Sequence, residues 1–202
     1  MPLAKVWLSA LSAYGILVAW VGPSIGNRAS FFVWLAAGLL YAHLFEYGYH
    51  RVVMHAGVRF LAFAKRSHLE HHRAFHSEHF TSRRPEERAQ IPSLWFVFPT
   101  LFVVHYVPVS LVLPGPIRLA FFTGVTFHYL VFETTHWFTH IEGNRFDRVL
   151  SRLPLLGALR RFQVRHHRVH HEIPDADFNF NPPFLGDLIF RTWRTPPREF
   201  AE

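Results

Sequence analysis

Four clusters of histidine residues, each at the border of a strongly apolar segment, constrain most what this chain can fold into. Ten of the 16 histidines make up these clusters: His50 and His55; His68, His71 and His72; His136 and His140; His167, His170 and His171. Neutral imidazole is a strong ligand of transition metals, and histidines three or four apart on a helix project from one face. One metal ion usually takes three or four protein ligands, so ten candidates predict two ions close together.

The ordinary explanation of a lone histidine is a structural, hydrogen-bonded role. Repeated HxxHH patterns on one chain disfavour that explanation here. The absence of cysteine excludes disulfides, iron–sulfur clusters and thiolate zinc sites. Any metal must therefore be held by nitrogen or oxygen ligands.

Length and composition favour one membrane-embedded domain over residues 1–202. Half of the chain is apolar, and its 22 phenylalanines exceed what the core of a soluble domain of this size needs. The net charge of +7 could indicate nucleic acid, but the basic residues alternate with the histidine clusters and flank apolar segments. We therefore expect no nucleic-acid partner, and a basic surface beside anionic lipid instead.

Four apolar segments predict an all-α integral membrane protein with about four transmembrane helices and a cytosolic helical cap that carries the histidines. The segments are Val6–Val21, stopped by Gly22 and Pro23; Phe31–Tyr49; Ile91–Leu113; and Ile117–Phe138, after the breaker Pro114-Gly115-Pro116. The first segment could instead be a signal peptide, but no small-x-small cleavage site follows it. The last two segments are typical of a transmembrane hairpin.

The distribution of basic residues predicts which side of the membrane the clusters face. Residues 51–90 contain eight Lys or Arg and residues 141–202 contain ten, whereas the short connections at 22–30 and 114–118 hold one each. The positive-inside rule then places the N-terminus, the C-terminus and all four clusters on the cytoplasmic side.

Spacing within the clusters predicts their local structure. His136 and His140 lie one helical turn apart, and His167, His170 and His171 follow the same logic on an Arg-rich segment expected to form a surface helix. His68, His71 and His72 repeat it on a helix beginning near Leu61, with His76 continuing the face. His50 and His55 are five apart, which on an α-helix separates them by about 140 degrees. We therefore expect the helix to end or bend between them.

Several further residues are candidates for supporting roles. Glu46 and Glu133 are carboxylates inside apolar sequence, and we expect each to orient a ligating imidazole through its second nitrogen. His76, His79 and His166 adjoin the clusters and are candidates for the second ligand shell. A group of aromatic residues is expected to wall a substrate pocket: Trp34, Phe45, Phe127, Phe132 and Trp137.

The four clusters resemble the HxxxxH, HxxHH, HxxxH and HxxHH boxes of the fatty acid hydroxylase and sterol desaturase superfamily. They read HRVVMH at 50–55, HLEHH at 68–72, HWFTH at 136–140 and HRVHH at 167–171, and Glu46-Tyr47 with His50-Arg51 resembles the EYxxHR start of the first box. The resemblance covers residues 40–195. The segment GDLIFRTWRTP at 186–196 resembles the closing WDxLFGT segment, with Gly186 where Trp is usual and Arg191 where Gly is usual.

The resemblance implies a non-haem dimetal enzyme that uses dioxygen as co-substrate to oxidise a carbon–hydrogen bond of a membrane lipid. It implies two iron ions, with zinc an alternative in purified protein because imidazole suits both metals. The haem-binding sequence HPGG does not occur. A separate electron donor, such as a cytochrome b5-like protein or a ferredoxin with its reductase, is therefore expected.

Three classes of function stay open at this point. The HxxxH box at 136–140 resembles hydroxylase relatives, which favours hydroxylation of a fatty acyl, sterol-like or related lipid. A lipid desaturase or a carotenoid hydroxylase of the same superfamily is the alternative. A membrane metal transporter would need polar ligands near the bilayer midplane, whereas the clusters gather at one interface, and a structural membrane protein with incidental zinc is the third class.

Overall fold

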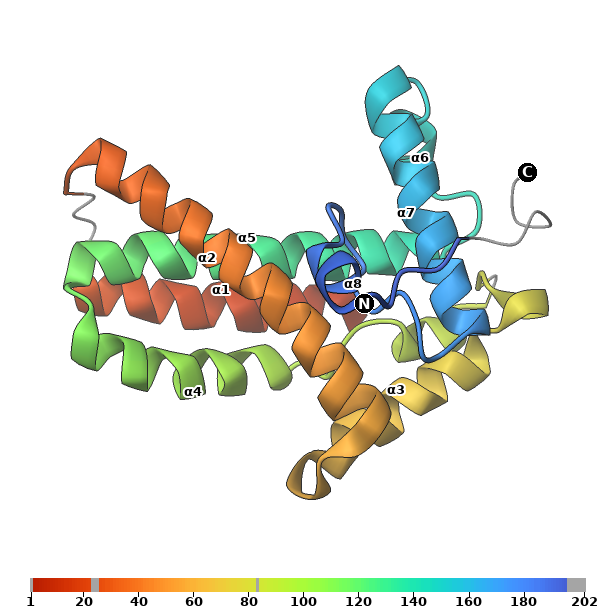
Figure 1. Cartoon of the computed structure of the whole chain (residues 1–202), viewed down its shortest axis with the longest axis horizontal. Helices are drawn as coiled ribbons and strands as arrows, with labels where there is room; N and C mark the ends of the chain where they lie inside the picture. Colours follow the sequence, from red (N-terminus) through yellow and green to blue (C-terminus); the bar gives the residue numbers. More distant parts are fainter. Residues whose placement is uncertain (1, 23–25, 83, 196–202) are drawn as a thin grey trace. The chain divides into compact units, whose positions relative to one another are not determined.

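The structure, a computed structural model, describes residues 2–22, 26–82 and 84–195, and over these ranges the chain is helical (Figure 1). This confirms the predicted all-α class. Among the residues that the structure describes, β-type pairing is limited to an isolated bridge between Ser82 and Ile141. The elements are α1 (Pro2–Val21), α2 (Arg28–Gly48), η1 (Tyr49–Gly57), η2 (Arg59–Leu61), α3 (Ala62–Ala74), η3 (Ser77–His79), η4 (Glu87–Gln90), α4 (Val97–Val112), α5 (Gly115–Thr139), α6 (Arg145–Leu150), α7 (Pro154–Glu172) and α8 (Leu185–Phe190).

Two helices among the described residues are long and apolar enough to cross a membrane, which supports an integral membrane protein. They are Pro2–Val21 and the continuous stretch Arg28–Gly57, which joins α2 to η1. The third predicted segment forms a helix of only 16 residues, α4, because Ile91–Phe96 is irregular. The fourth forms the 25-residue helix α5. The first helix ends at Val21 before Gly22, whose φ is +80°, and Pro23 lies outside the described residues.

Contacts divide the chain into two units, Met1–Ala42 with Pro92–Thr134 and His43–Ile91 with Thr135–Glu202. In the first unit α1, α4 and α5 run side by side (Figure 1) around a buried core of Ala10, Leu17, Phe98, Phe102, Phe121 and Phe122. Glycines let α2 approach α5 within this unit, because a Cβ at Gly38 would lie 2.1 Å from the Phe121 carbonyl oxygen. Small residues at helix crossings are typical of membrane bundles.

A cavity of about 820 Å³ opens between α1 and α4 in the first unit. Its lining includes Lys5, Ser12, Trp20, Trp95 and Tyr106. The aromatic residues predicted to wall a pocket are not among its lining residues. Its position was therefore not anticipated from the sequence.

The second unit contains α3, α6, α7 and α8 with the ends of α2 and α5. Asn144 caps α6 by accepting a 2.8 Å hydrogen bond from the Asp147 main-chain N–H, and Pro154 begins α7, where its missing N–H costs nothing. As predicted for a surface helix, α7 has one exposed side, with Leu155, Leu156 and Leu159 among its exposed residues. Its other side is buried, including His166, His167, Val169, His170 and His171, so its histidines face the interior of the unit.

Candidate metal centre

The structure brings nine of the ten predicted imidazoles into two groups, both within the second unit. The five-imidazole group is His50, His55, His68, His72 and His170, and the four-imidazole group is His71, His136, His140 and His167. Within each group, one ring nitrogen from every residue lies within 4.8 Å of the others. Four separate helical segments therefore contribute nitrogen atoms to two compact sets.

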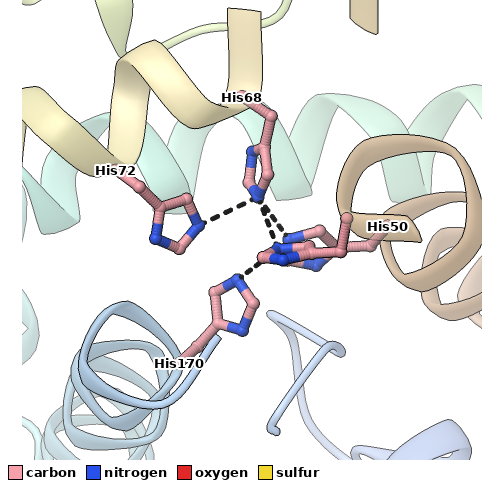
Figure 2. Close-up of side chains that lie close together, drawn as sticks. His50, His68, His72 and His170 are labelled. Carbon is pink, nitrogen blue, oxygen red and sulfur yellow. Dashed lines mark hydrogen bonds between the residues drawn. The ribbon is translucent and has the colours of Figure 1, made fainter. Parts of the chain in front are cut away.

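The five-imidazole group converges on His68 (Figure 2). The His68 Nε2 atom lies 2.9 Å from the Nε2 atoms of both His50 and His55 and 3.0 Å from that of His72. His170 reaches the group from α7, with its Nε2 3.2 Å from that of His55. The rings of η1, α3 and α7 thus point at one common space.

The four-imidazole group is built around His167 of α7. Its Nε2 lies 3.0 Å from the Nε2 of His140, which follows directly after α5. The tenth predicted histidine, His171, also lies here, with its Nε2 3.0 Å from the Nε2 of His167. His71 and His136 complete the group, with ring centroids 4.8 Å apart.

The two HxxHH boxes are shared between the groups in opposite ways. In the HLEHH box at 68–72, His68 and His72 face the five-imidazole group and His71 faces the four-imidazole group. In the HRVHH box at 167–171, His167 faces the four-imidazole group and His170 faces the five-imidazole group. Residues four apart on a helix lie on one face. The residue three after the first of them points about one sixth of a turn away from that first residue. Each box therefore supplies ligands to both groups.

The HRVVMH box at 50–55 has a backbone conformation that the sequence did not predict. Tyr49–Gly57 is a π-helix, so the prediction that the helix ends or bends between His50 and His55 is wrong. Hydrogen bonds in a π-helix run from i to i+5, which brings residues five apart near one another. The five-residue spacing that seemed unfavourable on an α-helix therefore places both imidazoles in the same group.

Main-chain carbonyl oxygens orient five of the ten imidazoles through Nδ1. The His50 Nδ1 lies 2.6 Å from Phe178 O, the His71 Nδ1 3.0 Å from Gln90 O, the His140 Nδ1 2.8 Å from Phe80 O and the His170 Nδ1 2.7 Å from Ala176 O. The His171 Nδ1 contacts Phe75 O. A carbonyl oxygen can only accept, so Nδ1 carries the proton and donates it, and Nε2 presents a lone pair.

These tautomers make each group suited to a cation. Nε2 lone pairs of His50 and His170 face the five-imidazole group, and those of His140 and His171 face His167. The His167 Nε2 can carry at most one proton, so it cannot donate to both lone pairs that face it, and the His71 Nε2 atom is buried without a hydrogen-bond partner. A transition-metal ion satisfies such converging neutral nitrogens, so the donor set fits the metal that the boxes imply.

Burial keeps the imidazoles neutral. It lowers the pKa of His71 to about 4 and, with the neighbouring imidazoles, the pKa of His72 to about 2. The same causes hold the pKa values of His68, His167, His170 and His171 well below 6.5. At neutral pH these side chains are unprotonated, so metal binding does not have to displace protons from Nε2.

Of the two predicted carboxylates Glu133 is buried and Glu46 is half-buried, and each accepts a main-chain hydrogen bond. The Glu46 Oε1 atom accepts a 2.5 Å bond from the Phe180 N–H, and the Glu133 Oε2 atom accepts a 3.2 Å bond from the Ser93 N–H. Their predicted role toward an imidazole stays a prediction. Carbonyl oxygens take the orienting role at the five histidines described above.

The three predicted second-shell histidines differ in position. α3 ends at Ala74, so the expectation that His76 continues its face is wrong, and His76 is exposed. His79 pairs with Glu87, with 3.3 Å between His79 Nε2 and Glu87 Oε2. His166 is buried between two carboxylates, with its Nε2 3.4 Å from Asp187 Oδ2 and its Nδ1 3.6 Å from Asp177 Oδ1.

The structure also explains the two departures in the closing segment, whose last residue Pro196 lies outside the described residues. A Cβ at Gly186 would lie 2.3 Å from the Tyr47 ring, so only glycine fits this position without a shift. Arg191 has φ +59° and ends α8 in the left-handed conformation that favours glycine. The backbone that glycine would adopt is therefore retained with arginine in its place.

Asp187 is a buried residue whose importance the sequence did not reveal. Its carboxylate accepts 2.8 Å hydrogen bonds from the main-chain N–H groups of Phe178 and Asn179. The D of the closing segment marked its presence, but the bonding partners lie in an irregular stretch that no periodicity identifies.

The chain was also compared with known proteins. No family model matches it. It is 31% identical over 139 residues to the ceramide very long chain fatty acid hydroxylase scs7 of Schizosaccharomyces pombe, an alignment of 67% of this chain and 37% of that protein. The chain thus matches little more than a third of the length of this curated relative.

The fold has a counterpart among solved structures. A structure described as full-length scs7p, with only the hydroxylase domain visible, superposes with a TM-score of 0.64 and 22% identity over 94% of this chain and 67% of that one. Sequence relative and fold relative therefore carry the same name, and the order of the histidine boxes in this chain agrees with the resemblance described above. The chain belongs to the fatty acid hydroxylase superfamily.

Proposed function

We propose that this protein is an oxygen-dependent lipid hydroxylase whose two metal ions, iron in the active state, are held by the histidine boxes. The observation that carries the proposal is the convergence of Nε2 lone pairs from η1, α3, α5 and α7, with Nδ1 turned to carbonyl oxygens at five positions. Without a cation such an arrangement leaves lone pairs unsatisfied, because His68 or His167 can donate at most one Nε2 proton to the several nitrogens that face it. It becomes favourable when a cation is bound.

The five-imidazole group would hold one ion, and the four-imidazole group together with His171 would hold the other. When bound, two iron ions would supply electrons that reduce dioxygen and so activate it to oxidise a carbon–hydrogen bond. Imidazole also binds zinc, so purified protein can contain that metal instead.

The chain's own part is to hold the ligands in place and to exclude water. His136, His140, His167 and His170 are buried, with exposures of 7%, 0%, 3% and 0%. Their rings are wedged against phenylalanines, for example Phe180 beside His136 and His167. A dry, prearranged ligand set protects reactive chemistry from solvent.

The proposed substrate is a lipid with a long acyl chain. The S. pombe relative is a ceramide very long chain fatty acid hydroxylase by name, and the apolar helices of this chain would give a lipid access from the bilayer. A separate electron donor, cytochrome b5-like or a ferredoxin with its reductase, would reduce the metal ions. Residues 51–90 and 141–202 hold 18 of the 21 basic residues, which favours a cytoplasmic location for both termini and the metal ions, with α4 and α5 as further spans.

Alanine at His71 or His170 tests the proposal on metal and product together. We expect His71→Ala to lower bound metal and His170→Ala to do the same, with loss of product in both, because each removes a ligand from a different group. His105→Ala is the matched control, since His105 contacts Leu101 O in α4 and belongs to neither group. Full oxidation activity in either box variant would refute the assignment.

Lipid mass spectrometry of cells with and without the protein identifies the reaction. Hydroxylation produces species heavier by one oxygen, whereas desaturation produces species lighter by two hydrogens. A metal transporter produces neither. Oxygen uptake coupled to a modified lipid separates the enzyme from a structural protein with incidental zinc.

A further inference from the structure

Two ligands of the five-imidazole group depend on one short stretch of irregular backbone. The carbonyl oxygens of Ala176 and Phe178 lie 2.7 and 2.6 Å from the Nδ1 atoms of His170 and His50, respectively. Residues 177–180 have no regular secondary structure, so no helix or sheet fixes these carbonyl groups. Something else must hold them, because an imidazole rotates freely when its orienting acceptor moves.

The carboxylate of Asp187 supplies that restraint. Its Oδ1 accepts a 2.8 Å hydrogen bond from the Phe178 N–H and its Oδ2 accepts one of 2.8 Å from the Asn179 N–H. Hydrogen bonds from main-chain N–H groups to a carboxylate are stronger than neutral ones. The peptide unit of the Phe178 carbonyl, which orients His50, is therefore tied directly to Asp187. The peptide unit of the Ala176 carbonyl, which orients His170, is held indirectly: the Asp177 N–H donates a 3.1 Å bond to Thr192 O, and the Thr192 hydroxyl binds Asp187.

Asp187 is itself rigidly held. It is completely buried at the start of α8, and the Thr192 hydroxyl donates a 2.7 Å bond to its Oδ1. The Asn179 side chain closes the arrangement, since its Oδ1 accepts a 2.8 Å bond from the Gly186 N–H. α8 and the irregular stretch thus lock each other through side chain and main chain.

We propose that Asp187 is a positioning residue for the metal ion of the five-imidazole group, acting through the main chain of residues 176–180 on His50 and His170. The inference rests on the proposed function, because it requires that the group binds metal. It does not extend to the four-imidazole group and His171, because the carbonyls that orient those imidazoles belong to Phe75, Phe80 and Gln90.

Asp187→Asn is the central variant. Asparagine keeps the shape of the side chain but replaces one acceptor oxygen by an N–H₂ donor, so one of the two main-chain N–H groups would face a donor. Loss of an outer-shell partner typically weakens metal binding by about 10- to 100-fold. We expect that loss for one ion only.

The experiment is a Zn²⁺ titration of the metal-free full chain in detergent micelles, with bound metal counted after equilibrium dialysis. Wild type should bind two ions, and Asp187→Asn should bind one as wild type does and the other about 10- to 100-fold more weakly. Asp147→Asn is the matched control: its carboxylate accepts bonds from Arg160 and Asn144 at the start of α6, and two ions should bind normally.

Combined variants separate positioning from general destabilisation. In a His50→Ala, His170→Ala background, which lacks both ligands oriented by this stretch, Asp187→Asn should cause no further loss, whereas with His167→Ala it should weaken the remaining ion. If Asp187→Asn does not fold, Thr192→Val removes the hydroxyl's 2.7 Å bond to Asp187 together with its 3.1 Å bond to the Tyr47 hydroxyl, and should weaken one ion by about threefold to tenfold.

Each outcome has one meaning. Wild-type binding of both ions in Asp187→Asn, or equal weakening of both, would overturn the inference. Absence of metal binding by the wild-type chain would instead contradict the proposed function.

Discussion

The two imidazole groups are oriented by backbone segments of different character. The five-imidazole group relies on Ala176–Phe180, in which every residue is buried, with exposures between 0% and 3%. The four-imidazole group and His171 rely on carbonyls from the segment 75–90, which exposes His76, Glu78, Pro85 and Gln90. One group is thus oriented by a fully buried stretch. The other is oriented by two buried residues, Phe75 and Phe80, and by the exposed Gln90, within a segment that reaches the surface.

The means of support differ in the same way. Carboxylates hold the inner segment: the buried Asp187 binds Phe178 and Asn179, and the half-buried Glu46 binds Phe180. The outer segment is held by short 3₁₀ turns and by the Ser82 N–H, which donates a 2.7 Å bond to His140 O. Backbone with solvent-exposed hydrogen bonds opens locally at lower cost than buried backbone. Similar ligand sets can therefore differ in how readily they release metal.

Chelation tests this difference most directly. We expect a chelator to remove the ion of the four-imidazole group at least about tenfold faster than the other, because local opening of 75–90 exposes it. His170→Ala and His167→Ala, loaded with metal, provide references in which one group has lost a ligand. The two release rates are measured by metal analysis over time. Equal rates for both ions would show that the exposed segment 75–90 does not control the release of metal.

Gly186→Ala should disturb the inner support alone. Its Cβ would lie 2.3 Å from Tyr47, a buried ring stacked on Phe190 at 5.0 Å between centroids, and overpacking of this kind costs about 1–3 kcal/mol. Thermal unfolding measures the loss of stability, and metal titration measures the loss of affinity, which we expect for the ion of the five-imidazole group only. Gly48→Ala, where a Cβ would meet nothing within 4 Å, is the control. An unchanged unfolding temperature in Gly186→Ala would mean that the Tyr47 ring moves aside without a loss of stability.

Arg191→Gly should strengthen the inner support slightly. Arg191 has φ +59°, and the left-handed conformation costs a residue with a Cβ about 1 kcal/mol relative to glycine. We expect the free energy of unfolding to rise by about that amount, measured by denaturant unfolding. Arg191→Ala removes the guanidinium but keeps the Cβ, so a comparable gain in that variant would assign the effect to charge.

Much of the fold and of the candidate site was predictable because it rests on local periodicity. The HxxHH boxes sit on α3 and α7 as predicted, and His136 and His140 lie one turn apart at the end of α5. The apolar segments fixed the helical class, although Ile91–Phe96 is irregular and shortens α4. The π-helix was missed, since its five-residue spacing has no distinctive composition and follows from a backbone shift of one residue.

The sequence by itself determined that the chain is helical, which superfamily it belongs to and that His136 and His140 face together, because the i, i+4 spacing acts within one helix. Only the tertiary structure decided how ten imidazoles divide between two groups and which carbonyl oxygens set their tautomers. Those partners lie up to 128 residues apart along the chain, as for His50 and Phe178. Contacts of that kind arise from the packing of irregular backbone against helices, and no local pattern encodes them.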